Sequence, residues 1–147
     1  MKVTIMENGR LKLDPDVLAG AEEAFRELRY VEAFALLQAL IDMQMTFICQ
    51  VNREMNAGEH PEVVHFGKEV WSFPKLRTYL LSRKIISKDL ADQLSKSYEL
   101  RNRIIHRLVF YSYQDYPQNI ITQMEAVDGF SSGKRQFKLL EEISDRV

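Results

Sequence analysis

Hydrophobic residues in this chain recur mainly at helical spacing. Apolar positions three and four residues apart are typical of a helix with one buried face. The pattern predicts long helices, and it places short ones where a proline or a polar cap follows a break. The predicted helices cover residues 15 to 28, 31 to 55, 74 to 83, 88 to 109, 119 to 127 and 135 to 146. Asp14-Pro15 is the predicted start signal of the first helix, Ser87 caps the fourth, and DGFSSGK (128 to 134) is expected to be a loop.

The first residues have a different pattern. The segment KVTIMENGRLKL (2 to 13) contains two short β-prone runs around Asn8-Gly9, a pair typical of a type I′ hairpin turn. A two-stranded hairpin is marginal in water, so we expect it to rest against the helices or a partner. The sequence predicts an all-α, antiparallel helical bundle over residues 14–147, with a hairpin over 1–13, as a single domain.

Composition narrows the class of protein. The chain has 147 residues, 46% hydrophobic and 28% charged, with a net charge of −1. Such a balance excludes a bulk nucleic-acid coat, so any RNA contact must use a local patch. The single Cys49 excludes an intramolecular disulfide and fits a reducing compartment. The start, MKVTIMENGR, lacks the apolar core of a signal peptide, and the apolar run 33–52 contains too many polar residues for a comfortable membrane span. We expect a cytoplasmic protein with no membrane contact.

One arginine stands out in the helix predicted over 88–109. Arg101 falls within the apolar stripe of that helix, and Asn102 and His106, four residues apart, lie together at its edge. Burying a guanidinium costs desolvation free energy unless an opposite charge compensates for it. In one interpretation, Arg101 pairs with Asp42, the one charged residue of the apolar run 33–52. In the other, it receives an anionic ligand such as phosphate, with His106 as its chemical partner.

These residues carry a resemblance to a known family. The pattern R-N-x-x-x-H, late in a helix after S-x-x-L-x-x-x-L, resembles the HEPN domains (higher eukaryotes and prokaryotes nucleotide-binding). The stretch AEEAFRELRYVEAFALLQALIDMQM is similar to the first two helices of that family, and the resemblance spans about residues 16 to 146. It implies an antiparallel bundle that forms a homodimer with two copies of the motif at a shared cleft. Many members are metal-independent ribonucleases, often toxins paired with a nucleotidyltransferase-type antitoxin.

The resemblance places catalysis on Arg101, Asn102 and His106, with Asp42 as a supporting residue. RNA is cleaved without a metal when its own 2′-hydroxyl attacks the adjacent phosphorus. The step needs a group that exchanges protons near neutral pH, as an imidazole of ordinary pKa (about 6.5) does. It also needs a cation at the phosphate, and the arginine fork suits that role. We expect His106 to be the general acid/base, Arg101 the phosphate clamp and Asn102 the orienting group, with no cofactor and no metal.

One departure from the family bears on regulation. Members regulated by an antitoxin often continue the motif as H-x-Y, whereas this chain has Leu108 at that position. We therefore do not expect regulation through a modified tyrosine at this position. The expected ribonuclease chemistry does not depend on that tyrosine. The alternatives are a non-catalytic nucleotide-binding or protein-assembly module, and a restraining partner of a separate enzyme.

Other features carry weaker expectations. A basic region near the helix predicted over 88–109 includes Arg77, Arg83 and Lys84. Together with Arg103, these residues are candidates for contact with RNA phosphates. The alternative for these residues is an ordinary solvated surface. The aromatic residues of the segment 62 to 73 either stack on bases or fill a small core; they are Phe66, Trp71 and Phe73. His60 and His65 have no set of ligands around them that would make a metal site.

Overall fold

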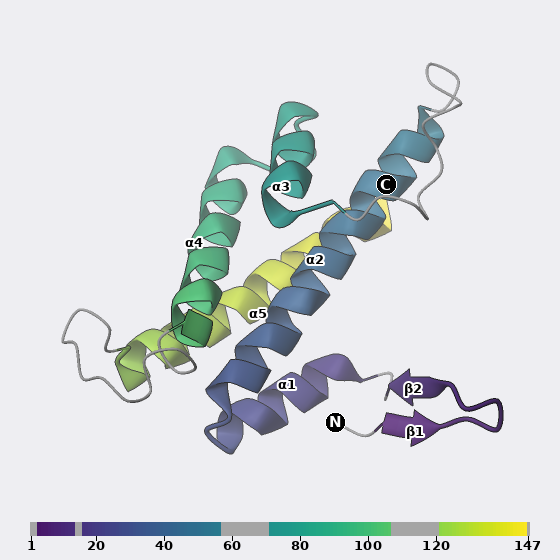
Figure 1. The fold of residues 1–147 in the computed structure, drawn as a ribbon. Helices are drawn as coiled ribbons and strands as arrows, with labels where there is room; N and C mark the ends of the chain where they lie inside the picture. The colour runs from purple at the N-terminus through teal and green to yellow at the C-terminus, as the bar shows by residue number, and fades with distance from the viewer. Residues whose placement is uncertain (1–2, 14–15, 57–70, 107–120, 147) are drawn as a thin grey trace.

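A computed structural model describes residues 3–13, 16–56, 71–106 and 121–146, and within them a hairpin precedes five helices (Figure 1). The mainly helical fold with an N-terminal hairpin is therefore confirmed. The elements are β1 (Val3–Ile5), β2 (Leu11–Leu13), α1 (Val17–Arg26), α2 (Tyr30–Met55), α3 (Phe73–Ser82), α4 (Lys88–Ile105) and α5 (Gln123–Arg146).

Helix α2 is the centre of the bundle. It packs against α1, α3, α4 and α5. Helices α1, α2, α4 and α5 alternate in direction, so that α2 and α5 run the same way (Figure 1). An aromatic cluster joins three of them. Phe25 of α1 stacks on Phe130 of α5 with ring centroids 4.4 Å apart, and Phe34 of α2 meets Phe130 edge-on at 5.7 Å. Such pairs add specific geometry to the burial of large apolar surfaces.

Helix α5 corrects the expected loop at residues 128 to 134. The segment DGFSSGK lies inside one continuous helix of 24 residues. Its glycines mark places where neighbouring helices come close. A Cβ at Gly129 would lie 2.0 Å from Cδ2 of Leu100, and one at Gly133 would lie 2.7 Å from Cδ2 of Leu37. Glycine at these positions allows α5 to approach α4 and α2 closely. The loop prediction was wrong because it took both glycines as turn residues.

Helices α1 and α3 end in the same hydrogen-bonded motif. In α1, Leu28 has φ +63°, and the N–H of Arg29 donates to the carbonyl of Ala24 at 2.8 Å. In α3, Lys84 has φ +58°, and the N–H of Ile85 donates to the carbonyl of Leu80 at 2.9 Å. This is the Schellman arrangement, which usually has glycine at the left-handed position. The break expected near residues 29 and 30 is confirmed. The left-handed residue that causes it is Leu28, so no glycine marks the position in the sequence.

The helix starts follow the predicted chemistry in part. The side chain of Ser87 accepts a hydrogen bond from the N–H of Leu90 at 3.1 Å, which confirms it as the N-cap of α4. In α1, the capping residue is Asp16, whose carboxylate accepts from the N–H of Ala19 at 3.0 Å. Asp14 and Pro15, the expected start signal, lie outside the described residues. Both caps satisfy N–H groups that the first turn leaves unpaired.

The hairpin has the expected strands with a different turn. β1 and β2 pair antiparallel with Ile5 opposite Leu11, and the N–H of Gly9 donates to the carbonyl of Met6 at 2.9 Å. Gly9 has φ +76°, whereas Asn8 does not adopt a positive φ, as a type I′ turn would require at both positions. The connection between the strands is five residues long, from Met6 to Arg10, with glycine at its single left-handed position. Every side chain described from residue 3 to 12 is exposed, so the expected rest against the helices is not seen.

Helix α2 also has the length and composition of a membrane span. It is 26 residues long, and 44% of its most apolar window is buried inside the bundle. The buried positions face the neighbouring helices α1, α3, α4 and α5, as expected for the central helix of a bundle.

A side chain at Gly133 is expected to weaken the bundle. Gly133→Val would force Leu37 or the α2–α5 contact to shift, because the added Cβ meets Leu37 at 2.7 Å. We expect a loss of about 1–3 kcal/mol in the free energy of unfolding, measured by urea denaturation. Lys138→Val, at an exposed position of the same helix, controls for helix propensity. Equal stability of the two variants would contradict the close-packing role of Gly133.

Candidate functional site

A seam of polar side chains runs between α2, α4 and α5. Gln38 of α2 and Gln136 of α5 are 3% and 1% exposed. The hydroxyl of Ser97 on α4 donates to Oε1 of Gln136 at 2.8 Å, and Nε2 of Gln136 donates to the hydroxyl of Ser132 at 3.0 Å. Buried polar groups are stable only when paired in this way. The seam thus fixes the face of α4 that carries Arg101, one turn beyond Ser97.

Arg101 is half-buried at the end of this seam. Its Nη1 donates to Oδ1 of Asn102 at 2.8 Å, and its guanidinium lies 5.5 Å from the ring centroid of Tyr98. Its Nε is buried and meets no acceptor in the described part of the chain. Beside it lies a cavity of about 10 Å³, lined by residues that include Gln38 and Ser97. That volume holds one water at most, so an anion can reach only the outer side of the guanidinium.

Asp42 is near Arg101 without a direct ion pair. Nε2 of Gln38 donates to Oδ1 of Asp42 at 2.9 Å, and within the described residues no nitrogen of Arg101 lies within 4.0 Å of the carboxylate. Burial raises the pKa of the Asp42 carboxyl, while the Gln38 hydrogen bond and the charge of Arg101 act in the opposite direction. Asp42 therefore acts on Arg101 by electrostatic attraction over a distance, and the hydrogen bond from Gln38 holds the carboxylate in place.

His106 lies where the described part of α4 ends. It is the C-cap residue, with helical φ −62° and ψ −46°, and its side chain is exposed. Asn102 is half-buried one turn before it on the same face. The structure thus places Arg101, Asn102 and His106 on the last two turns of one helix. Leu108, the position of the missing tyrosine, lies outside the described residues.

Two of the four basic candidates make ion pairs within the fold. Arg77 of α3 donates from Nε to the carbonyl of Ala91 at 3.1 Å and pairs with Asp92 at 3.1 Å, which ties α3 to α4. Arg103 pairs with Glu125 of α5 at 3.3 Å. The other two candidates lie at the α3–α4 turn and are exposed; they are Arg83 and Lys84.

A separate groove lies along α3. It has a volume of about 590 Å³ and is lined by residues that include Trp71 and Tyr79, whose ring centroids are 5.4 Å apart. Arg53 and Lys75 place their charges 4.7 Å and 4.5 Å from the Trp71 centroid. Phe73 is buried and belongs to the core, stacked on Tyr98 at 4.4 Å. Phe66, the third aromatic residue considered from the sequence, lies outside the described residues.

The buried glutamines are the part of the site that sequence reasoning missed. Gln38 precedes Asp42 by four residues on the inner face of α2, and Ser97 precedes Arg101 by four on α4. Polar residues one turn before a buried charge are the signal that was available. Within the described ranges, no group of three or more metal-ligating side chains gathers, and His60 and His65 fall outside them.

No protein-family model, no curated protein and no solved structure matches this chain.

The burial of Asp42 predicts a pH-dependent effect of its removal. In the unfolded chain its carboxyl has the ordinary pKa of 3.8, and the folded value is higher. The native state therefore loses stability relative to the unfolded state as pH rises from about that value through the folded pKa. Asp42→Asn keeps an acceptor for Gln38 without the charge. We expect its stability relative to the unmodified protein to rise between pH 4 and pH 7, measured by urea denaturation.

Asp128→Asn, exposed on α5, controls for the loss of one carboxylate elsewhere. A stability difference for Asp42→Asn that stays flat or falls over the same pH range would contradict the desolvation of Asp42.

Proposed function

We propose that this protein is a metal-independent endoribonuclease of the HEPN type. The supporting observation is the position of Arg101, a half-buried guanidinium with no carboxylate within 4.0 Å in the described part of the chain, on the same two helical turns as Asn102 and the exposed His106. Desolvation strengthens the attraction of a guanidinium for phosphate oxygens, because water competes less for its charge. The R-N-x-x-x-H pattern links this arrangement to RNA cleavage.

The reaction divides into roles that these residues suit. The 2′-hydroxyl of a ribose attacks the adjacent phosphorus and loses its proton to a base, and the 5′-oxygen leaves and takes up a proton. The products are a 2′,3′-cyclic phosphate and a 5′-hydroxyl. His106 exchanges the protons, Arg101 contacts the phosphate oxygens on which negative charge develops, and Asn102 orients the guanidinium through its 2.8 Å hydrogen bond.

A second subunit completes this mechanism. The attacking and leaving oxygens lie on opposite sides of the phosphorus, and one imidazole does not reach both sides at once. A homodimer with two copies of His106 in a shared cleft supplies a base and an acid. Phosphates along the RNA would be guided by Arg83 and Lys84, while Arg77 and Arg103 would have to leave their ion pairs to take part.

The biological setting belongs to the same proposal. The protein acts in the cytoplasm as the toxin-like component of a toxin–antitoxin system, restrained by a partner of the nucleotidyltransferase type. Leu108 stands where antitoxin-regulated HEPN proteins often have the tyrosine that such partners modify, so restraint here would act through binding.

One observation favours a second candidate function. Large apolar side chains are exposed on the hairpin and on α2, among them Ile5 at 74% and Phe47 at 49%. Such surfaces are typical of proteins that assemble with partners. A non-catalytic assembly module would bind its partners through these exposed apolar side chains. In such a module, Arg101 would hold a nucleotide or stabilise the fold.

Cleavage of a labelled RNA in the presence of EDTA tests the proposal. Arg101→Ala and His106→Ala are each expected to lower the rate by about 100-fold or more, since each removes a charge-stabilising or proton-transferring group. The products should carry 2′,3′-cyclic phosphate ends, and a 2′-deoxy substitution at the cleaved position should block the reaction.

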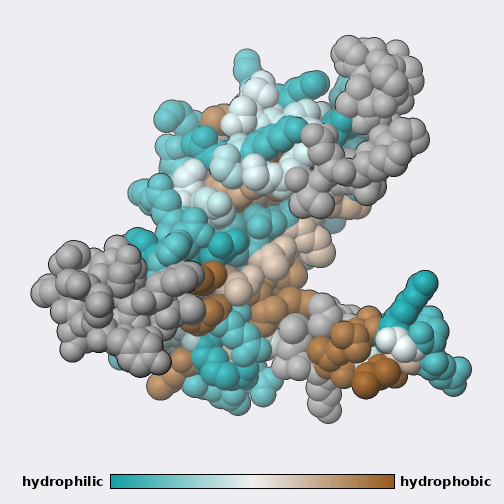
Figure 2. Space-filling model, viewed as in Figure 1, coloured by the Kyte–Doolittle hydropathy of each residue, from teal (hydrophilic) through white to brown (hydrophobic). Residues whose placement is uncertain are grey.

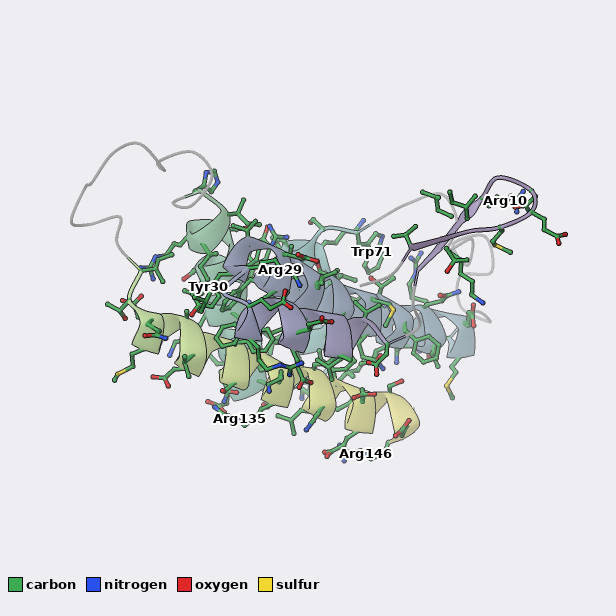
Figure 3. The ribbon with its side chains drawn as sticks, turned by 90° about the horizontal axis from the view of Figure 1, so that it is seen from below. Arg10, Arg29, Tyr30, Trp71, Arg135 and Arg146 are labelled. Atoms are coloured by element: carbon green, nitrogen blue, oxygen red, sulfur yellow. The ribbon has the colours of Figure 1, made fainter. Side chains whose placement is uncertain are left out.

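The matched control is Arg135→Ala, since Arg135 projects from α5 away from the other helices (Figure 3). It should cleave at the rate of the unmodified protein. Full activity of folded His106→Ala would contradict the proposal, and a contaminating ribonuclease would be recognised because every variant would cleave equally. Nucleotide binding without cleavage would favour the assembly module.

A further inference from the structure

The groove along α3, which we call the α3 groove, combines aromatic rings with positive charge. Trp71 and Tyr79 line it, with an angle of 62° between their rings. The ammonium of Lys75 lies 4.5 Å from the centroid of the Trp71 ring, and the guanidinium of Arg83 lies 5.0 Å from that of Tyr79. Each ring therefore has a cation next to it. This pairing suits a ligand in which flat rings alternate with anionic groups.

The segment that forms the α3 groove carries positive charge only. Residues 71–88 contain no aspartate or glutamate and five cationic residues, which are Lys75, Arg77, Arg83, Lys84 and Lys88. Arg77 and Lys88 pair with Asp92 of α4 at 3.1 Å and 3.6 Å. Arg53 of α2 adds a further cation, 4.7 Å from the ring centroid of Trp71. Such a local excess attracts anions even though the net charge of the whole chain is −1.

The α3 groove also has the size and surroundings of a ligand site. Its volume of about 590 Å³ lies within the range of small-molecule sites, about 300–1,000 Å³. Figure 2 shows that the described surface over α3 is mainly hydrophilic, whereas apolar side chains gather on the hairpin and between the lower helices. An acidic peptide would use the cations and leave the ring faces without a partner. A nucleotide uses both, with its base on a ring and its phosphate on a cation.

A second hollow lies between the α3 groove and the candidate site. It has a volume of about 290 Å³, shares Pro74 and Thr78 with the groove, and is also lined by Tyr98 of α4. Pro74 and Thr78 are four residues apart on α3, so they form the ridge between the two hollows. The guanidinium of Arg101 lies 5.5 Å from the ring centroid of Tyr98. A strand that crosses this ridge therefore runs from Trp71 toward Arg101.

We propose that the α3 groove binds one nucleotide of a single-stranded RNA, with the base against the ring of Trp71 and a neighbouring phosphate at Lys75. The choice of RNA as the ligand rests on the proposed function. The ammonium of Lys75 ends a flexible four-carbon chain, so it can move from the indole ring to the phosphate when the base takes its place. Bases paired within a duplex do not reach the rings. The groove thereby selects single strands at a point away from the cleaved bond.

Binding of an RNA that cannot be cleaved tests the α3 groove apart from catalysis. The probe is a labelled single-stranded oligonucleotide with every 2′-hydroxyl methylated, and fluorescence anisotropy measures its dissociation constant. Trp71→Ala should raise that constant by at least about fivefold, because it removes the stacking of one base. Trp71→Phe keeps an aromatic ring and should recover most of the affinity. Circular dichroism checks that the helices remain in both variants.

Lys75 gives a second test that does not disturb the core, because its side chain is exposed on α3. Lys75→Gln should weaken binding and lower the slope of log K against log salt by about 0.7, since one phosphate contact is lost. The matched control is Lys138→Gln, which removes the same charge from an exposed position of α5 and should leave the slope unchanged. Equal slopes for the two variants would overturn the proposal.

Competition and photo-cross-linking identify the occupant of the α3 groove. An RNA duplex of the same length and polyglutamate should each compete at least about tenfold more weakly than the single strand, since neither offers an unpaired base. An oligonucleotide with 5-iodouridine should cross-link to Trp71 or Tyr79 on irradiation, as located by mass spectrometry. Equal competition by the duplex or by polyglutamate, or cross-links confined to other helices, would overturn the proposal.

The outcomes separate this inference from RNA cleavage. A protein that binds the methylated RNA through Trp71 and Lys75 but cleaves no RNA would support the α3 groove and contradict the proposed nuclease. A protein that cleaves RNA, with a dissociation constant unaffected by Trp71→Ala and Lys75→Gln, would overturn the groove and leave the nuclease standing. A protein that binds no RNA would overturn both.

Discussion

The burial of α2 is the constraint on which the rest of the structure depends. This helix is apolar on most of its sides, so it is stable in water only when several neighbours remove that surface from solvent. α1, α3, α4 and α5 each contact it, and the aromatic cluster of Phe25, Phe34 and Phe130 fixes two of them at one end. α2 also carries Gln38 and Asp42 toward the motif helix. The element that organises the core thereby positions the candidate site as well.

Arg101 shows how unevenly polar groups are satisfied inside this bundle. Gln136, almost fully buried, has partners on both sides through Ser97 and Ser132. Arg101, less buried, leaves Nε without an acceptor in the described part of the chain. An unpaired buried donor costs about 1–3 kcal/mol. The unpaired buried donor therefore lies on Arg101 of the R-N-x-x-x-H motif, whereas the buried side chain of Gln136 is paired. In natural proteins, polar groups left without partners are commonly found at functional sites.

Much of the fold could be predicted from periodicity and capping chemistry, because these signals are local. The break between α1 and α2, the cap at Ser87 and the short helix after Pro74 all follow from neighbouring residues. The loop predicted around Gly129 and Gly133 was wrong, because their role depends on Leu100 and Leu37, which are distant in sequence. The seam at Gln136 was missed for the same reason. The inward position of Arg101 could be calculated from helical spacing, whereas the ion pairs of Arg77 and Arg103 depend on tertiary contacts.

The position of Trp71 determines what optical spectroscopy can see in this protein. It is the single tryptophan of the chain, and it lies between Arg53 of α2 and Tyr79 of α3. Its emission therefore reports the docking of the short helix α3 on the end of α2. The aromatic cluster at the α1–α2–α5 contact consists of phenylalanine side chains, so its assembly is nearly invisible at tryptophan wavelengths. Fluorescence and far-ultraviolet dichroism will follow one common transition only if α3 undocks together with the whole bundle.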